Sequence, residues 1–435
     1  MMDFLRKIIP EPILLFYHKC FSILANLIYR FPGRKLYVIG VTGTNGKTTT
    51  VKLISSILEE AGENVGMTST VYFQINRKKW FNKTKMTVPG RFFFPKMLRK
   101  MVKAGCKYAV LEVSSHAIRQ HRVWGIPFDT AIITNLTHDH LDYHHGFEDY
   151  RATKGQLFAN LALSKHRKPG MEKVSVINAD DPESWYFAQF WAQKKFAYTL
   201  TDADIGIPRI EAANIKIEDN KTSFSLISPV GKTDINLNLL GRYNVTNAIA
   251  AAACAISQGI KLPIIKKGLE KVKGISGRME EVDLGQNFKV LVDYAHTPDA
   301  FQKVFESVKP LPHHKIISVF GATGDRDKEK RPVLGEIAAK NSDYVILTLE
   351  DPGSEDPAEI IKAIEPGVVR EGKIKDKNYF KIIDREEAIK KSFKIASKND
   401  IVLLLAKGHE QVMQMKGKKV PWDDRLVAQK ILKKG

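Results

Sequence analysis

The amino-acid sequence predicts an α/β protein with two unlike α/β domains, each built on a parallel sheet, preceded by a short apolar helical arm. Short apolar runs alternate with longer helical patterns from Lys35 onward, which is typical of a parallel sheet flanked by helices. The 435 residues, 43% of them hydrophobic, suffice for two or three domains with their own cores. We expect the arm over residues 1–34, a central domain over residues 35–276 and a C-terminal domain over residues 277–435.

The arm contains one apolar stretch, residues 13–29, in which apolar side chains recur at helical spacing. Polar residues such as His18 and Asn26 interrupt the stretch, so it is too polar to span a bilayer. The amphipathic helix expected here has two interpretations. It packs on the body of the protein, or it makes peripheral contact with a membrane close to Arg6, Lys7 and Arg30.

The central domain begins with an alternation of strand-like runs and helical patterns. After the first run, apolar residues within Val51–Ala61 share one helix face, and Gly62 stands where a C-terminal cap belongs. Within residues 214–240 the apolar period changes to two around the turn signal Ser228–Gly231, which predicts an antiparallel hairpin. The strand-like runs are Leu36–Val41, Tyr108–Leu111, Ala131–Thr134 and Val174–Ile177.

The C-terminal domain repeats this alternation. Its strand-like runs are separated by segments of helix length, so a second parallel sheet is expected. The runs are Phe288–Val292, Ile316–Phe320, Tyr344–Leu347 and Ile401–Leu405.

Charge and cysteine usage narrow the function classes. The net charge of +20 favours anionic partners such as nucleotides, nucleic acids or acidic lipid surfaces. Cys20, Cys106 and Cys254 are far apart and lack CxxC spacing, which argues against a disulfide framework or a cysteine-based zinc site. We therefore expect a cytoplasmic protein in a reducing compartment.

The strongest local signal is a glycine-rich loop between the first strand-like run and the first helix. Its glycines allow backbone N–H groups to approach phosphate oxygens, and the helix N-terminus adds positive dipole. Lys47 supplies a point charge and Thr48 a hydroxyl that can ligate magnesium. The spacing departs from the usual pattern, because Val41 stands where the longer motif has glycine. The loop consists of Gly43, Thr44, Asn45, Gly46, Lys47, Thr48 and Thr49.

Two polar clusters follow later strand-like runs of the central domain. Residues 112–116 begin with Glu112 at the carboxyl end of a strand, where ligands collect and a carboxylate can hold magnesium opposite the loop. Residues 134–145 are rich in His and Asp, and their spacing alone is equally compatible with a metal site and a solvated loop. The magnesium-nucleotide site implied by Lys47 favours a ligand role for His140.

The C-terminal domain contributes clusters that mix cations with acids, most of them after strand-like runs. This composition suits a cleft that binds phosphates on one side and a zwitterionic substrate on the other. Each cluster alone is weak evidence for a binding site, because residues such as Arg278 and His296 are more often ordinary surface residues. The clusters are residues 277–280, 293–298, 321–327 and 407–410.

Taken together, these motifs resemble those of the Mur ligases of peptidoglycan synthesis, and most closely those of the ligase that adds the third residue of the stem peptide. The resemblance extends from about Val38 to Glu410 and rests on an ordered series rather than on one motif. The series comprises residues 43–49, 112–122, 135–144, Tyr150 with Lys154, and residues 241–247, 277–280, 293–298, 325–332 and 408–410.

The resemblance implies a central ATP-binding domain, a Rossmann-like C-terminal domain and an ATP-dependent, ADP-forming amide ligase. The carboxylate of a nucleotide-linked muramyl dipeptide would attack the γ-phosphate of ATP, and an amino acid would then displace phosphate from the acyl phosphate. The chemistry agrees, because a carboxylate is a poor electrophile until phosphorylation supplies a leaving group. Lys47 and Mg²⁺ would stabilise charge on the transferring phosphoryl group.

The resemblance also implies roles for single residues. Lys47, Glu112, His140 and Lys154 would form a catalytic group, and Thr48 would hold Mg²⁺ together with the last three. Lys154 matches a carbamylated lysine of the family, whereas without the resemblance it would be taken as an exposed helix lysine. Besides the loop, the nucleotide side would comprise Asn244, Asn247, Arg278, Asp293 and His296. Muramyl-peptide contacts would be Thr87, Ser114, Gln120 and Arg122, while Arg326 and Glu410 would hold the amino acid.

Two departures from the family pattern concern the substrates. Typical members begin with a domain of about a hundred residues that binds the uridine diphosphate group, whereas residues 1–34 alone precede the core here. The arm could instead bring the enzyme near a lipid-linked muramyl peptide, or a partner protein could supply the contacts. Members that add meso-diaminopimelate carry Asp-Asn-Pro-Arg, but residues 350–353 read Glu-Asp-Pro-Gly. Because Gly353 cannot form the salt bridge of that arginine, lysine or another diamine without a second carboxylate is expected.

Three other functions compete with this one. The lipid-linked amidating ligase of the same superfamily commonly carries a cysteine-rich zinc insert, which this sequence does not have. Folate polyglutamate ligases share the phosphate loop, but residues 114–116 and 120–122 look like muramyl recognition. A nucleic-acid binder or silent scaffold would leave the four residues of the catalytic group without a purpose, and no RNA-binding aromatic motif occurs. Small-molecule substrates, and no nucleic acid, are therefore the expected partners.

Overall fold

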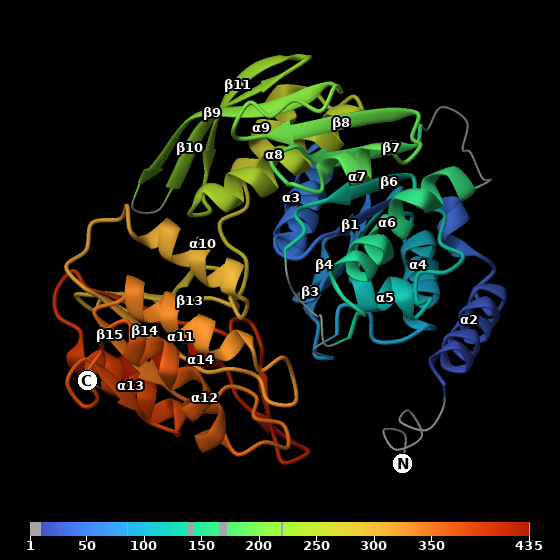
Figure 1. Ribbon diagram of the computed structural model, residues 1–435. Helices are drawn as coiled ribbons and strands as arrows, with labels where there is room; N and C mark the ends of the chain where they lie inside the picture. Colours follow the sequence, from blue (N-terminus) through green and yellow to red (C-terminus); the bar gives the residue numbers. More distant parts are fainter. Residues whose placement is uncertain (1–9, 85, 138–142, 165–171, 219–220, 435) are drawn as a thin grey trace. The chain divides into compact units, whose positions relative to one another are not determined.

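The computed structural model describes residues 10–434, except residue 85 and residues 138–142, 165–171 and 219–220. The chain forms two compact units, which are coloured from blue to yellow-green and from yellow to red along the sequence (Figure 1). Of the helices in the described ranges, none combines the length and the apolar character needed to cross a bilayer. Unit 1 consists of residues 1–216, 223–237 and 243–272, and unit 2 of residues 217–222, 238–242 and 273–435.

Unit 1 is built around an 11-stranded sheet. Its strands are β1 (Tyr37–Thr42), β2 (Val65–Thr68), β3 (Tyr72–Ile75), β4 (Lys78–Phe81), β5 (Tyr108–Glu112), β6 (Thr130–Ile133), β7 (Val174–Asn178), β8 (Lys194–Thr199), β9 (Arg209–Glu218), β10 (Lys221–Ser228) and β11 (Gly231–Leu237). The order is β11-β10-β9-β8-β7-β6-β1-β5-β2-β3-β4. All neighbours from β9 to β2 pair in parallel, while β3 and β4 continue antiparallel. The α/β prediction is thus confirmed.

The strands predicted for this region are present, with ends that differ by a residue or so. The additions are polar residues at the carboxyl ends, such as Thr42 and Glu112, which still pair in the sheet because Val41 lies opposite Glu112. The predicted hairpin is also confirmed, since only residues 229–230 separate β10 from β11 and so short a link joins antiparallel strands. Strands β2 to β4 were not predicted, because they are short and β4 at the sheet edge is largely exposed.

Helix α3 (Lys47–Glu60) follows β1 and buries the apolar face that the sequence predicts. It ends in a Schellman motif, in which Gly62 N–H donates to Glu59 O and Glu63 N–H donates to Leu58 O, both at 3.0 Å. Gly62 has a φ of +82°, so the predicted cap is confirmed. The other helices of unit 1 are α2 (Glu11–Ile28), the 3₁₀ helix η1 (Pro32–Lys35), α4 (Phe93–Lys103), α5 (Ser115–Arg119), α6 (Phe147–Leu163), α7 (Ser184–Ala188), α8 (Arg242–Ser257) and α9 (Leu262–Glu270).

The predicted helix of the arm is present as α2 and packs on the body of unit 1 next to α4. Three of its four buried side chains are polar, and the fourth is the small Ala25. Asn26 is buried and its Nδ2 donates to Trp124 O at 2.8 Å and to Ser22 O at 3.0 Å. His18 and Ser22 are buried on the same side of the helix.

Unit 2 contains a six-stranded sheet in the order β12-β13-β17-β14-β15-β16, in which all neighbours except β12 and β13 are parallel. Because the carboxyl ends of parallel strands meet at one edge, the loops after them converge there. The strands are β12 (Glu280–Glu281), β13 (Lys289–Val292), β14 (Ile316–Phe320), β15 (Tyr344–Leu347), β16 (Tyr379–Lys381) and β17 (Ile401–Leu404), with the separate pair β18 (Val412–Met415) and β19 (Lys418–Pro421). The helices are α10 (Pro298–Val308), α11 (Lys330–Asn341), α12 (Pro357–Arg370), α13 (Arg385–Ile395) and α14 (Asp424–Leu432).

Candidate functional site

The glycine-rich loop lies between β1 and α3, as the sequence predicts. Both glycines have positive φ, +144° at Gly43 and +85° at Gly46, in a backbone region that favours glycine. A Cβ atom at Gly43 would overlap Thr134 Oγ1, and one at Gly46 would overlap Asn247 Oδ1. Glycine is therefore required at both positions for the loop to fit against its neighbours.

The residues that follow β6 hold this loop in shape. Asn135 Oδ1 accepts from Asn45 N–H at 2.9 Å, and Asn135 O accepts from Thr44 N–H at 2.8 Å. In return, Asn45 O accepts from Thr134 Oγ1 at 2.6 Å and from Asn135 Nδ2 at 3.1 Å. Side chains of a neighbouring strand end thus fix the backbone of the loop. Asn135 was part of a recognised motif, but no position-specific role was predicted for it.

Positive charge converges on the loop. Helix α3 begins at Lys47, and the first N–H groups of a helix have no partner within the helix. Lys47 bends back over the loop, because its Nζ donates to Gly43 O at 3.0 Å and to Thr44 O at 2.8 Å. The helix dipole and the ammonium group together provide what phosphate binding needs.

Thr48 and Glu112 form a pair that could hold a divalent cation. Thr48 Oγ1 donates to Glu112 Oε2 at 2.9 Å, and both side chains are buried. The carboxylate also accepts from Thr70 N–H and from Thr70 Oγ1, each at 2.8 Å. A hydroxyl and a carboxylate beside a phosphate loop are hard oxygen ligands of the kind that Mg²⁺ prefers, so these residues fit the ion. Thr70, which follows the unpredicted strand β2, was missed by sequence reasoning.

Lys154 on α6 contacts the same loop. Its side chain is buried, and its Nζ donates to Gly43 O at 2.8 Å. The Tyr150 ring lies 4.3 Å from Nζ, and the Tyr150 hydroxyl lies 3.1 Å from Thr44 Oγ1. The alternative of an exposed helix lysine is therefore wrong. His140, the fourth residue of the predicted catalytic group, lies outside the described residues.

Helix α8 brings two predicted nucleotide-side residues to the start of α3. Asn247 Oδ1 accepts from Thr50 Oγ1 at 3.3 Å, and Asn247 Nδ2 donates to Asn244 Oδ1 at 3.2 Å. Both amides are buried, as is Thr49 in the first turn of α3. The pairing joins residues about 200 positions apart in the sequence.

The predicted muramyl-peptide contacts form a chain that starts at the Glu112 carboxylate. Thr70 Oγ1 lies 3.0 Å from Thr87 Oγ1, and Arg122 donates to the carbonyl of Val88. Arg122 also donates to Gln120 Oε1 through Nη2 at 2.6 Å and Nε at 3.1 Å. Ser114 caps α5, where its Oγ accepts from Ala117 N–H at 3.3 Å. The hydrogen bonds of Thr87, Gln120 and Arg122 thus run from the cation pair toward α5.

In unit 2, the predicted residues Arg278, Asp293 and His296 gather around Tyr294. The Arg278 guanidinium lies 4.7 Å from the Tyr294 ring, and His296 Nδ1 lies 2.8 Å from Tyr294 O. Asp293 is buried and accepts from Met279 N–H at 2.7 Å and Ala295 N–H at 2.6 Å. Burial raises the pKa of the Asp293 carboxyl, although Arg278 lowers it in part.

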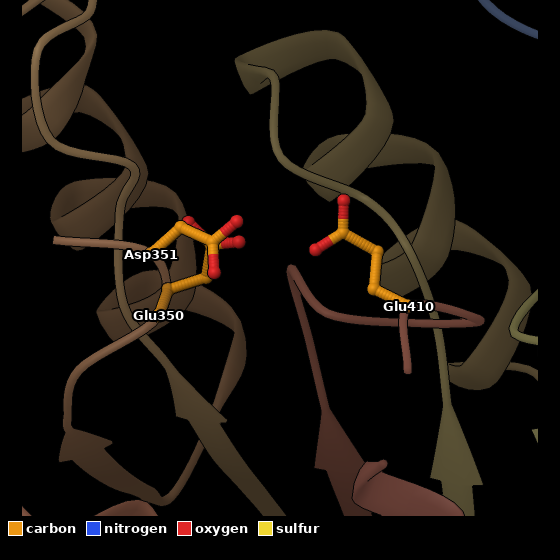
Figure 2. Close-up of side chains that lie close together, drawn as sticks. All are labelled: Glu350, Asp351 and Glu410. Carbon is orange, nitrogen blue, oxygen red and sulfur yellow. The ribbon is translucent and has the colours of Figure 1, made fainter. Parts of the chain in front are cut away.

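Glu410 lies in a cluster of three carboxylates, which point toward one another in Figure 2. Lys407, which no prediction singled out as a site residue, is fully buried among them. Its Nζ lies 2.6 Å from Glu410 Oε2, 2.8 Å from Asp351 Oδ1 and 3.8 Å from Glu350 Oε1. Burial lowers the pKa of Lys407, but the carboxylates outweigh it and raise that pKa above its ordinary value. Lys407 thus places an ammonium group among these carboxylates.

Gly353 and Arg326 lie at a turn beside this cluster. Gly353 has a φ of +61°, and a Cβ atom there would overlap the Asp325 carboxylate. That carboxylate is fixed, since it accepts from Ser354 N–H at 2.8 Å and from Ser354 Oγ at 2.6 Å. Arg326 follows Asp325 and is exposed. The backbone at this turn thus requires glycine at position 353, where family members that add diaminopimelate carry arginine.

Comparison with known families covers most of the chain. The family described as Mur ligase middle domain matches residues 41–255, and the family described as Mur ligase, glutamate ligase domain matches residues 277–408. These two matches correspond to the central and C-terminal parts of the sequence.

Curated relatives and solved structures agree with the family matches. The UDP-N-acetylmuramoyl-L-alanyl-D-glutamate–2,6-diaminopimelate ligase of Bacillus licheniformis is 40% identical over 425 residues, which cover 97% of this chain and 84% of that protein. The UDP-N-acetylmuramyl-tripeptide synthetase of a Roseiflexus species is 42% identical over 413 residues, 94% of this chain and 81% of that protein. A solved structure of a 2,6-diaminopimelate ligase of this kind has a TM-score of 0.62 and 31% identity, and covers 92% of this chain and 78% of its own.

Proposed function

Because the chain belongs to the Mur ligase family, whose members are ATP-dependent amide ligases that form ADP, we propose that it adds the third residue of the stem peptide to a UDP-linked muramyl dipeptide. The observation that carries the proposal is the arrangement of Lys47, Thr48 and Glu112 at the loop between β1 and α3. A phosphate-binding loop beside a hydroxyl–carboxylate pair is what transfer of a phosphoryl group requires.

In this proposal, the loop and Lys47 bind and orient the phosphates of ATP, and Thr48 and Glu112 would hold Mg²⁺. When bound, the ion would neutralise negative charge on the phosphates. The acceptor carboxylate attacks the γ-phosphorus, and ADP leaves with the bond electrons. The amino group of the incoming amino acid then attacks the acyl carbon, phosphate leaves, and the amine gives up its proton. Lys47 stabilises the charge that develops in the first step.

The test is phosphate release from ATP and Mg²⁺ in the presence of UDP-linked muramyl dipeptide and one amino acid at a time. We expect release that depends on both the dipeptide and the amino acid. The Lys47→Ala variant is the matched control for contaminating ATPases. Release that needs neither substrate, or that persists in this variant, contradicts the proposal.

The amino acid is proposed to be lysine or another diamine without a second carboxylate. Three buried or partly buried carboxylates surround a single ammonium group, Lys407, so this region attracts a further cation such as a side-chain amine. Gly353 offers no guanidinium to pair with a second carboxylate. The Bacillus licheniformis relative and the solved structure are named as diaminopimelate ligases, so lysine and meso-diaminopimelate are compared in the same phosphate-release assay. Faster turnover with meso-diaminopimelate than with lysine contradicts this part.

Lys154 is proposed to carry a carbamate. A carbamate forms when the neutral amine attacks carbon dioxide and releases one proton. The resulting carboxylate-like head would contribute oxygen to the Mg²⁺ that Thr48 and Glu112 hold. Supporting this, Lys154 is buried in unit 1 and its Nζ lies 2.8 Å from Gly43 O, within the loop itself.

The enzyme is proposed to work in the cytoplasm with peripheral membrane contact through residues 13–29.

One contact favours a lipid-linked muramyl peptide as a second candidate acceptor. Glu11 of α2 accepts from Arg119 Nε of α5 at 2.8 Å, which attaches the arm beside Gln120 and Arg122. Comparing UDP-linked and lipid-linked acceptors in the same assay separates the candidates. If turnover with the UDP-linked acceptor is absent and turnover with the lipid-linked one is present, the second candidate replaces the first.

A further inference from the structure

Helix α2 is amphipathic, but its polar face packs against the protein and its apolar face is exposed. At about 100° per residue, its apolar side chains Ile13, Phe16, Leu24 and Leu27 share one face, and His18, Ser22 and Asn26 share the opposite face. The polar face is buried against unit 1, whereas Phe16 is 69% exposed, Ile13 60% and Leu27 56%. Tyr17, Phe21 and Ile28 extend the exposed apolar stripe.

This orientation needs an explanation. Single exposed apolar residues are ordinary on protein surfaces, but a contiguous apolar stripe marks an interaction surface. The stripe is fixed in this orientation, because Asn26 bonds Trp124 O and Glu11 bonds Arg119 on the opposite side. A Cβ atom at Gly125 would contact Asn26 at about 3 Å, so the polar face fits closely against the body.

The surroundings of the stripe are strongly cationic. Helix α4 contacts α2, with the rings of Phe21 and Phe92 6.5 Å apart. Within residues 10–35 and 91–107 the single acidic residue is Glu11, and its carboxylate is already engaged by Arg119 and His145. The exposed basic residues of these segments are Lys19, Arg30, Arg34, Lys35, Lys96, Lys100, Lys103 and Lys107, of which Lys107 is paired with Glu63.

We propose that α2 is a docking surface for an anionic lipid membrane, on which the helix lies flat with its apolar stripe inserted among the lipid chains. An apolar stripe flanked by lysines and arginines is the combination that binds such surfaces. The helix is about 27 Å long, and its buried polar face stays on the protein. A second copy of this chain is a poorer occupant, because two cationic surroundings would repel each other. The docking does not rest on the ligase activity.

The test is co-sedimentation of the full chain with phosphatidylcholine vesicles, with and without phosphatidylglycerol. We expect binding that requires phosphatidylglycerol and weakens with added salt. A triple variant Ile13→Ser, Phe16→Ser and Leu27→Ser should partition at least about tenfold less. The matched control replaces equally exposed apolar residues elsewhere, Leu163→Ser, Val369→Ser and Leu426→Ser, and should bind as the unaltered chain does.

Each other result overturns the proposal. Equal binding of the two triple variants removes α2 from the contact, and equal binding to neutral vesicles removes the anionic requirement. Absence of binding, with a dimer in sedimentation velocity that the α2 variant abolishes, assigns the stripe to a second copy instead. Circular dichroism confirms that both variants fold. Phosphate release with soluble acceptor is measured without vesicles, so failure of the proposed ligase activity is recognised separately and leaves the docking result intact.

Discussion

Replacing Gly46 by Ala tests whether the phosphate loop depends on its contact with α8. An alanine at a φ of +85° costs about 1–2 kcal/mol of folding free energy. Its Cβ would also displace the Asn247 amide, which breaks the bonds to Thr50 and Asn244 at about 1 kcal/mol each. We therefore expect Gly46→Ala to destabilise the protein by about 3–4 kcal/mol.

Gly62→Ala is the matched control. Gly62 has a similar φ of +82°, but a Cβ atom there meets nothing within 4 Å. We expect this variant to lose only the backbone cost, about 1–2 kcal/mol. Urea unfolding followed by circular dichroism measures both variants, and the KM for ATP should rise at least about tenfold in Gly46→Ala alone. Equal unfolding midpoints together with an unchanged KM for ATP would refute the reasoning.

Three further predictions concern single side chains. Lys47→Ala should lower kcat/KM by about a thousandfold or more with the fold intact, because charge on the phosphoryl group loses its stabilisation; near-normal turnover contradicts this role. Lys154→Ala should lose activity that added acetate or propionate restores in part, with Lys47→Ala as the control that neither acid restores; activity equal to that of the unaltered chain argues against the carbamate. The Arg331 guanidinium lowers the pKa of Glu355 to about 2 from an ordinary 4.5, so this carboxylate stabilises the fold above pH 4.5 and its contribution is lost as the pH falls toward 2. Glu355→Gln should flatten the fall of the unfolding midpoint in that window, and superimposable acid profiles of the two proteins contradict the ion pair.

The parts that sequence predicts best are those whose signal is local. The loop at residues 43–49 is contiguous, and its glycines, lysine and hydroxyls indicate phosphate binding without any information from the rest of the chain. Central parallel strands such as β1 and β17 are predictable for the same reason, since each is a short apolar run buried on both faces. Parallel strands nearer the sheet edges, such as β8 and β16, are partly exposed and were not predicted.

Other parts depend on contacts that no local pattern encodes. The need for glycine at Gly46 arises from Asn247, some 200 residues away. Thr70 contacts Glu112 only because the short strand β2 lies beside β5 in the sheet. Helical spacing in the arm predicts α2, yet it does not say which face is buried. The buried face is determined by hydrogen-bond partners on the rest of the protein, such as Trp124 O, which accepts from Asn26.

The turn at Gly353 restricts which side chains this position can take. Gly353→Arg alone would place a Cβ into the Asp325 carboxylate at a backbone angle that disfavours any side chain, so the intermediate protein would be strained. A smaller residue at Asp325 would have to come first, and it would release Ser354 from both of its hydrogen bonds. The order of substitutions therefore matters at this turn, because the Asp325 carboxylate decides whether a side chain at position 353 can fit.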